Sequence, residues 1–447
     1  MINIHIGIDD VDSINGGCTT HYAVLLAWEL RRRGYLFTDY PNLVRLNPAV
    51  PWKTRGNGAV ALRLSVPSES DVLDIWELAR NTLEEYTGLF QDPKKQPGLI
   101  LHTGDIPWEY KWLAEKALYD IIPLDLAQRV LMKHPETRVY NSRKRGLIGA
   151  LSAIGYTMQN TDYTYELLAY RKQEYWGRER QVDEMSIIEV DRLYHGELIL
   201  NYDYDAQRPL ITPRGPDPVL LGLRGENPHI LLEAFRKIVI HEPVEYIAIY
   251  RTNQHTDAHL HRVDSLCNLR PYMCVVVEGV VSSKPTRIPG GHVVFKLCSG
   301  ECCIDVAVYE PTKKLRDVVE ELVVGDRVEV MGCSRPPSSK HGLTLNLEKI
   351  RIVELVELVE YVNPKCPVCR STMESMGRGK GYRCRKCGYR DPRAVKTPII
   401  KPRKIKPGIY QPPPSAFKHL MKPIERIGRE KTSFNGVEIE EFIVKLS

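Results

Sequence analysis

The sequence predicts a multidomain α+β protein, and three observations support that fold class. Segments with strand and helix periodicity alternate through residues 1–268, as they do in α/β and α+β domains. Residues 269–362 contain five short apolar runs, the outline of a small barrel. Residues 363–395 then carry two pairs of closely spaced cysteines, the pattern of a zinc ribbon. A chain of 447 residues has room for three or four domains.

The first segment opens with a strand, because isoleucines at the even positions of 2–8 alternate with polar or small residues. This pattern is not a signal peptide, since no basic region or cleavage site follows. A polar loop spans residues 9–17, and Thr19 or Thr20 can cap the helix after it. A second strand and a second helix complete an α/β domain that we expect over residues 1–130.

Strand and helix periodicity repeats on a smaller scale after residue 130. Residues 146–154 have helical spacing, residues 165–170 have strand spacing, and Asn227 caps a helix with Pro228 at its first position. Two strand–helix alternations of this length are typical of a ferredoxin-like unit, which we expect over residues 131–268.

The five apolar runs of residues 269–362 are interrupted once, after the third run, by a short helical segment. That order is the outline of an OB-fold barrel, although strand count alone also fits an SH3-like barrel. Beyond the cysteine pairs, residues 396–447 begin with a stretch rich in Lys, Arg and Pro, which predicts a basic extended tail and not a packed domain. The alternative is a tail that folds back onto the rest of the chain and stabilises it.

The composition is that of a folded protein, with 43% hydrophobic and 26% charged residues, and no apolar run reaches membrane-spanning length. We therefore expect a cytoplasmic protein with no membrane partner, and nothing indicates a protein partner. The net charge of +6 is uneven. Residues 363–447 hold 20 Lys/Arg and 7 Asp/Glu, which gives +13 and leaves −7 on residues 1–362. A basic region of this kind favours a polyanion such as nucleic acid, or is a solvated tail.

Four of the 11 cysteines form two C-x2-C pairs separated by 14 residues. Four thiolates at this spacing bind one structural Zn²⁺ tetrahedrally, and they leave no position for water. These ligands are Cys366, Cys369, Cys384 and Cys387. The other seven show no disulfide framework, which fits a reducing compartment. They are Cys18, Cys267, Cys274, Cys298, Cys302, Cys303 and Cys333.

Cations on the ribbon and on the tail can contact RNA phosphates, and tyrosines among them can stack on unpaired bases. The alternative is a ribbon that only packs against the body. The cations expected to contact RNA are Arg378, Lys380, Arg383, Arg385 and Lys386 on the ribbon, with Arg403 and Lys404 on the tail.

Three carboxylates follow the first strand, at Asp9, Asp10 and Asp12. Carboxylates clustered at the end of a buried strand repel one another unless a cation lies among them, so the cluster predicts a Mg²⁺ site beside a nucleotide phosphate. The alternative is a turn in which the Asp side chains cap backbone N–H groups.

Two further segments can bind phosphate. Gly16, Gly17, Thr19 and Thr20 supply backbone N–H groups, hydroxyls and a helix start, although the segment is not a Walker A motif and Thr19 can be a plain N-cap. The second segment places two cations before a glycine-containing turn, and an exposed hairpin turn explains it equally well. It consists of Lys53, Arg55, Gly56, Asn57 and Gly58.

Several motifs follow one another in order along nearly the whole chain. They are Gly7-Ile8-Asp9-Asp10-Val11-Asp12-Ser13, Gly17-Cys18-Thr19-Thr20, Arg45-Leu46-Asn47-Pro48, Pro51-Trp52-Lys53-Thr54-Arg55-Gly56-Asn57-Gly58, Gly146-Leu147-Ile148-Gly149-Ala150, Thr164-Tyr165-Glu166-Leu167, Gly215-Pro216-Asp217-Pro218, Arg251-Thr252-Asn253-Gln254, Tyr309-Glu310-Pro311-Thr312 and the cysteine pairs. Together they resemble the archaeal tRNA(Ile2) 2-agmatinylcytidine synthetase family. One departure is Val11, where that family more often has Thr.

The resemblance implies a kinase-like domain, a ferredoxin-like domain, an OB-fold and a zinc ribbon. It implies a ligase that joins agmatine to the wobble cytidine of the CAU-anticodon isoleucine tRNA, with ATP going to AMP through a phosphorylated base. Asp9, Asp10 and Asp12 match the family's acidic residues, and Thr19 matches a threonine that the domain phosphorylates. ATP, Mg²⁺ and Zn²⁺ are the implied cofactors.

Two other functions are compatible with parts of the sequence. A non-catalytic single-stranded nucleic-acid-binding protein would need only the barrel and the ribbon, and the acidic loop argues against it. An adenylating ligase would need a nucleophilic lysine in an adenylation motif, which the sequence lacks. The agmatine site is left open among four carboxylates, none of which ranks above the others: Asp162, Glu166, Asp203 and Asp217.

Overall fold

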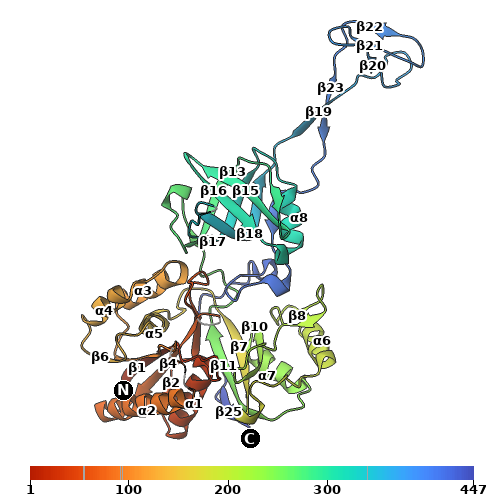
Figure 1. Cartoon of the computed structure of the whole chain (residues 1–447). Coiled ribbons are helices and arrows are strands. Elements are labelled where there is room, and N and C mark those ends of the chain that lie inside the picture. Colours follow the sequence, from red (N-terminus) through yellow and green to blue (C-terminus); the bar gives the residue numbers. More distant parts are fainter. Residues whose placement is uncertain (54–55, 91, 93, 340, 447) are drawn as a thin grey trace.

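The computed structural model describes residues 1–53, 56–90, 92, 94–339 and 341–446. It has an α+β body, a β-barrel and a small ribbon domain at the end of a two-stranded arm, as Figure 1 shows. Within these residues, no helix has the length and apolar character needed to cross a membrane.

The body is built on a single ten-stranded sheet with the order β10-β7-β11-β3-β4-β1-β5-β6. Neighbouring strands are antiparallel except β3 and β11, which pair in parallel and join the two halves of the body. The strands are β1 (Ile2–Asp9), β3 (Asn42–Arg45), β4 (Gly58–Val66), β5 (Gly98–Thr103), β6 (Thr137–Tyr140), β7 (Thr164–Arg171), β10 (Val219–Gly225) and β11 (Val244–Thr252), with β2 (Leu36–Phe37) beside β4.

Helices cover this sheet, and one of them approaches it very closely. A Cβ on Gly7 of β1 would lie 2.1 Å from the backbone oxygen of Ala150, so only glycine permits the contact with α5. Both α5 and β6 follow residue 130 in the chain, yet they pack on strands that precede it. The helices of the body are α1 (Thr19–Arg32), α2 (Glu69–Gly88), α3 (Trp108–Tyr119), α4 (Leu124–Leu131), α5 (Gly146–Gly155), α6 (Glu184–Leu193) and α7 (Pro228–Lys237).

The second unit is a closed barrel. Its five main strands, with one helix after the third, confirm the order that the sequence predicts for residues 269–362. β13 pairs with β17 on one side and with β15 on the other, so the order β13-β17-β18-β16-β15 closes on itself. Its interior is filled by aliphatic side chains and Phe295. The elements are β13 (Cys274–Val281), β15 (His292–Ser299), β16 (Cys302–Val308), α8 (Lys314–Glu320), β17 (Arg327–Arg335) and β18 (Thr344–Glu354), with β12 (His261–Arg262) and β14 (Thr286–Ile288) at its edges.

Six cysteines of the barrel region form disulfides, so the expectation of no disulfide framework is wrong. The bonds are Cys267–Cys302, Cys274–Cys333 and Cys298–Cys303. Two of the three join residues that face each other across adjacent antiparallel strands, β13 with β17 and β15 with β16. Sequence spacing does not reveal such pairs because register between strands is a tertiary property.

The tail is extended, but it packs against the rest of the chain, so the expectation of an unpacked arm is also wrong. β23 (Thr397–Lys401) pairs with β19 (Leu358–Val362), and β24 (Gly408–Tyr410) pairs with β18 of the barrel. Further on, Leu420 and Met421 are buried, and β25 (Ile443–Lys445) adds a strand to the body sheet beside β11. Apolar residues spaced irregularly among the prolines provide these contacts.

Candidate active site

The acidic loop lies where β1 ends, as the sequence predicts. Asp10 has a left-handed backbone (φ 55°), which is rare for a residue other than glycine and turns the loop sharply. Burial raises the pKa of Asp9 well above its usual range, and the nearby charges of Asp10 and Asp12 raise it further. A divalent cation among these oxygens would remove the repulsion.

Thr19 is held by this loop and does not cap helix α1. The N-cap is Cys18, whose sulfur accepts the backbone N–H of His21 at 3.4 Å. The Thr19 hydroxyl accepts the N–H of Val11 at 3.2 Å and donates to Asp12 Oδ2 at 2.8 Å. The expectation of Thr19 or Thr20 as the cap is therefore wrong, and the Thr19 oxygen is left to face a carboxylate that can accept its proton.

One cavity opens on the Asp9 and Asp10 side of the loop. Charged side chains of both signs and apolar side chains line it, and helix α5 begins at its edge. The Arg145 guanidinium lies 5.8 Å from the centre of the Trp52 ring, which lines the same cavity. Polar and charged lining residues are Asp9, Asp10, Lys53, Asn57, Asp120 and Arg145, and apolar ones include Trp52, Ile121 and Ile122.

A second cavity, of about 330 Å³, opens on the Asp12 and Thr19 side of the loop. Arg45 and Arg224 line it, and burial lowers the pKa of each. Arg45 lies 3.6 Å from a carboxylate oxygen of Glu166. Further lining residues are Thr20, Gly56, Gly58, Asp217 and His419. The acidic loop thus has an oxygen-rich face toward each of two cavities.

The parallel junction of β3 and β11 holds the second cavity in shape. Asn253, directly after β11, accepts the backbone N–H of Arg45 at 2.7 Å and donates to the Arg45 carbonyl at 2.9 Å. Gln254 donates to Glu166 and its amide oxygen lies 3.0 Å from His419 Nδ1. The motif 251–254 therefore orients the charged groups of the site.

The structure brings together most of the predicted phosphate-binding residues. Lys53 and Asn57 line the first cavity, and Gly56 and Gly58 line the second. Arg55 lies outside the described residues. Gly16 and Gly17 pack under aromatic rings, with Phe90 within 3.1 Å of the Cβ positions of both, and neither lines these two cavities.

Of the four candidate agmatine carboxylates, two line the second cavity, Glu166 and Asp217. The other two are engaged elsewhere. Asp162 is 2.9 Å from the Arg426 guanidinium, and Asp203 accepts the N–H of Ser415 at 2.9 Å.

Arg45, Arg224 and His419 were not predicted as site residues. No local pattern marks them, because they come from three segments that only the fold brings together.

The four ribbon cysteines form a thiolate cluster. Cys366 and Cys387 sulfurs are 3.5 Å apart, Cys369 and Cys384 sulfurs are 3.4 Å apart, and all four lie within 4.8 Å of one another. These spacings suit one tetrahedral Zn²⁺. The short strands β20 (Glu374–Ser375), β21 (Tyr382–Arg383) and β22 (Arg390–Asp391) carry the cluster at the far end of the β19–β23 arm (Figure 1).

The cations expected to contact RNA fall into two groups. The five on the ribbon (Arg378, Lys380, Arg383, Arg385 and Lys386) are exposed, although Arg385 also pairs with Glu374 at 2.6 Å. Those on the tail are in ion pairs: Arg403 lies 2.7 Å from the buried carboxylate of Asp326, and Lys404 lies 2.8 Å from Glu321. The sequence predicts that Arg403 and Lys404 contact RNA phosphates. In the structure both cations instead pair with carboxylates of the same chain, which gives them a structural role.

Three family models match the chain: the TiaS TCKD domain over residues 5–143, the TiaS FLD domain over 144–259 and the TiaS C-terminal zinc ribbon domain over 363–405. The tRNA(Ile2) 2-agmatinylcytidine synthetase TiaS of Staphylothermus marinus is 51% identical and covers 98% of this chain and 97% of its own length. The crystal structure of the TiaS–tRNA(Ile2)–ATP complex is 36% identical, with a TM-score of 0.83 over 98% of this chain and all of the other. The TiaS–tRNA(Ile2)–AMPCPP–agmatine complex is 35% identical, with a TM-score of 0.81 over 95% and 98%.

An α+β body with a charged two-cavity site, followed by a barrel and a zinc ribbon domain, defines a multidomain synthetase. Within that class, the chain belongs to the tRNA(Ile2) 2-agmatinylcytidine synthetase family, TiaS.

Proposed function

We propose that this chain is an ATP-dependent ligase that attaches agmatine to the wobble cytidine of the CAU-anticodon isoleucine tRNA, forming 2-agmatinylcytidine. Membership of the family supports the reaction. The observation that carries the assignment of the site is the Asp12–Thr19 hydrogen bond, on an acidic loop that contributes lining residues to two polar cavities. A protein that only binds nucleic acid has no need of three clustered carboxylates beside a hydroxyl.

ATP occupies the first cavity in this proposal. The apolar wall of Trp52, Ile121 and Ile122 suits a nucleotide base, while Lys53 and Arg145 suit its phosphates. Mg²⁺ is held by Asp9, Asp10 and Asp12, and it neutralises charge on the transferred phosphoryl group.

Thr19 takes part in phosphoryl transfer. As its oxygen attacks the γ-phosphorus of ATP, the bond between that phosphorus and the bridging oxygen breaks and ADP leaves, while the hydroxyl proton passes to Asp12, which already accepts the hydrogen bond. Activation of the cytidine works by the same chemistry. Phosphorylation of its carbonyl oxygen makes that oxygen a leaving group, and the agmatine amine then displaces phosphate. ATP ends as AMP and two phosphates in this scheme: the β-phosphoryl group of ADP passes to the cytidine oxygen and leaves AMP, and water releases the phosphate from Thr19.

Agmatine occupies the second cavity. Its two ends are cationic, and two carboxylates of this cavity's lining, Glu166 and Asp217, match them; Glu166 also contacts Arg45, and Asp217 pairs with Arg180. Arg45 and Arg224 are left to neutralise phosphate as it forms. The tRNA base must leave its stack to reach this position.

The remaining units bind the rest of the tRNA and are proposed as an OB-fold barrel and a Zn²⁺-loaded ribbon with exposed cations. The kinase-like and ferredoxin-like names for the two halves of the body belong to the same proposal. Acting on tRNA with ATP, the protein works in the cytoplasm.

Replacement of Asp10 by Ala tests the proposal. We expect ATP consumption and agmatine incorporation to be lost, while tRNA affinity stays within about twofold, since the loop contributes to catalysis and not to RNA binding. Asp74→Ala on the exposed face of α2 is the matched control. Normal product formation by Asp10→Ala, measured by mass analysis of tRNA nucleosides, would contradict the assignment.

A further inference from the structure

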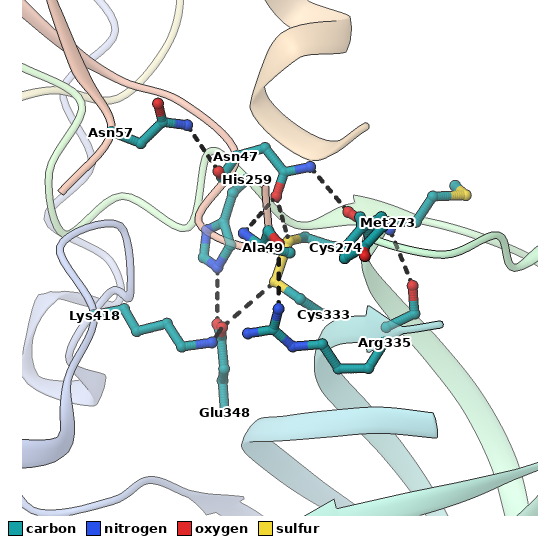
Figure 2. Close-up of a disulfide and its surroundings, with 12 residues drawn as sticks. Asn47, Ala49, Asn57, His259, Met273, Cys274, Cys333, Arg335, Glu348 and Lys418 are labelled. Carbon is teal, nitrogen blue, oxygen red and sulfur yellow. Dashed lines mark hydrogen bonds and ion pairs between the residues drawn. A yellow bond between two sulfur atoms is a disulfide. The ribbon is translucent and has the colours of Figure 1, made fainter. Parts of the chain in front are cut away.

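A second cluster of metal-ligating groups lies where the barrel meets the body, and Figure 2 shows it. It combines His259, which follows β11, with Cys333 of β17 and Glu348 of β18. The imidazole Nε2 is 2.8 Å from Glu348 Oε2, and the Cys333 sulfur is 3.5 Å from Glu348 Oε1. One ligand atom from each residue lies within 4.8 Å of the others, and all three residues are buried.

The polar groups of this cluster are not all satisfied. His259 Nδ1 is buried with no hydrogen-bond partner among the described residues. Among the described residues, Lys418 is the only lysine or arginine that pairs with the Glu348 carboxylate; its ammonium lies 2.6 Å from Oε1 and its side chain is 37% exposed. Because Lys418 reaches in from solvent, a metal ion can replace it without burying an unpaired ammonium.

A route to the cluster exists. Glu348 and Lys418 both line a cavity of about 430 Å³, which also touches Arg335 and Pro412. An ion that enters this cavity therefore meets the Glu348 carboxylate first. Of the other two ligands, Cys333 lies on β17, which pairs with β18, and His259 lies on the segment after β11.

The disulfide between Cys274 and Cys333 controls whether the cluster can bind metal. In the structure Cys333 is bonded to Cys274, its register partner on β13, and a disulfide sulfur is a poor metal ligand. The other two ligands, one imidazole and one carboxylate, are too few for a stable site. Reduction restores a thiol at the position that completes the set.

We propose that reduction of the Cys274–Cys333 disulfide opens a second Zn²⁺ site made by Cys333, His259 and Glu348, distinct from the zinc ribbon. A dithiol supplies two electrons and two protons and becomes a disulfide, while Cys274 and Cys333 become thiols. Zn²⁺ then displaces the proton of the Cys333 thiol, and water fills the fourth position. Lys418 moves out to solvent as the dication takes its place.

The state of this site bears on the active site through Asn47. The Cys274 sulfur contacts Asn47 Oδ1 at 3.3 Å, and the backbone oxygen of Asn47 accepts the side-chain amide of Asn57 at 2.9 Å. A disulfide sulfur has no proton to donate, whereas the reduced Cys274 thiol donates to Asn47. Reduction thus changes the contact between Cys274 and Asn47. Asn47 in turn holds Asn57, which belongs to the turn of residues 56–58 that lines both cavities.

The test compares Cys274→Ser with Cys333→Ser in the full-length chain. Both variants lack this disulfide and keep every other cysteine, but only Cys274→Ser retains the proposed thiolate ligand. Each protein is reduced with a phosphine, incubated with zinc chloride, desalted, and assayed for bound zinc per chain by mass spectrometry. We expect Cys274→Ser to carry one zinc ion more than Cys333→Ser, and the reduced native chain one more than the oxidised chain.

Equal zinc content in the two variants would overturn the proposal. If Cys333→Ser does not fold, as judged by circular dichroism, the double variant Cys274→Ser/Glu348→Gln replaces it, because it removes a different ligand. That double variant should bind one zinc ion fewer than Cys274→Ser, and an unchanged content would again overturn the site.

Discussion

The hydroxyl of Thr19 donates a hydrogen bond of 2.8 Å to Asp12, and the same oxygen accepts the backbone N–H of Val11. The threonine is thereby fixed on the acidic loop from the first turn of α1. Its oxygen already lies within hydrogen-bond distance of the carboxylate that we propose receives the proton during phosphoryl transfer.

Removal of this hydroxyl should abolish the reaction. We expect Thr19→Val to lower agmatine incorporation by about 10²-fold or more, because the oxygen that we propose attacks ATP is lost. Thr19→Ser keeps the oxygen and should retain activity within about tenfold. Transfer of labelled phosphate from ATP distinguishes the two variants, and an active Thr19→Val protein would exclude a role for Thr19 in chemistry.

The close contact of helix α5 with the acidic loop gives a second prediction. A Cβ on Gly149 would lie 1.9 Å from Asp9 Oδ2, so Gly149→Ala must displace the carboxylate. A displacement of this size should lower ATP turnover by about 10²-fold. Gly88→Ala, at the end of α2, meets no atom within 4 Å and should leave turnover unchanged. Similar turnover in both alanine variants would show that the Asp9 position is not critical.

Loss of zinc from the ribbon should separate RNA binding from ATP turnover. Cys384→Ser removes one thiolate and should unfold the ribbon, since metal binding supplies the folding energy of so small a domain. We expect weaker tRNA retention, with tRNA-independent ATP turnover and the melting temperature of the body preserved. If Cys384→Ser instead lost ATP turnover and retained tRNA fully, the prediction that the ribbon serves RNA binding and not ATP turnover would be contradicted.

The tail offers a matched pair of cations. Arg403 pairs with the fully buried Asp326, so Arg403→Ala should destabilise the protein by about 3 kcal/mol by leaving a carboxylate unpaired. Lys404 pairs with the more exposed Glu321, and Lys404→Ala should cost less than about 1 kcal/mol. Urea unfolding measures both variants, with tRNA affinity as the second readout. If Arg403→Ala lowers tRNA affinity and leaves the free energy of unfolding unchanged, the result would support the RNA contact that the sequence predicts for Arg403.

Burial of His21 predicts a pH dependence of stability. Burial lowers the pKa of His21 to about 3, against 6.5 in the unfolded chain. The unfolded state therefore binds more protons between these values, so stability is complete above pH 6.5 and falls as the pH decreases. His21→Gln should reduce the slope of unfolding free energy against pH by about 1.4 kcal/mol per unit below pH 6.5. An unchanged slope between pH 4.5 and 6.5 would contradict this.

The sequence predicts the elements whose pattern is local. Alternating isoleucines locate β1, and the Asn227 cap with Pro228 locates the start of α7, where the Asn side chain accepts two N–H groups. The contiguous carboxylates locate the acidic loop for the same reason. Strands β5 and β6 and helix α3 were not predicted, since their apolar residues carry no clear period.

The remainder of the site depends on contacts between distant segments. Arg45 and Arg224 meet only because β3 and β11 pair in parallel, and His419 reaches the second cavity only because the tail folds back. The disulfide Cys274–Cys333 likewise follows from the register of β13 and β17. None of these contacts can be predicted from the local sequence pattern.

The position of β25 beside β11 makes the barrel and the ribbon an insertion within the body. Both strands belong to one sheet, yet every residue from 253 to 442 must be synthesised before they can pair. Closing so long a loop delays completion of the body, because contacts of high sequence separation form late. During translation the barrel and the ribbon can fold before β25 is made, so an interrupted chain would carry the parts that we propose bind RNA on a body that is still open. The sheet that carries the charged site is therefore complete only after the whole insertion has been synthesised.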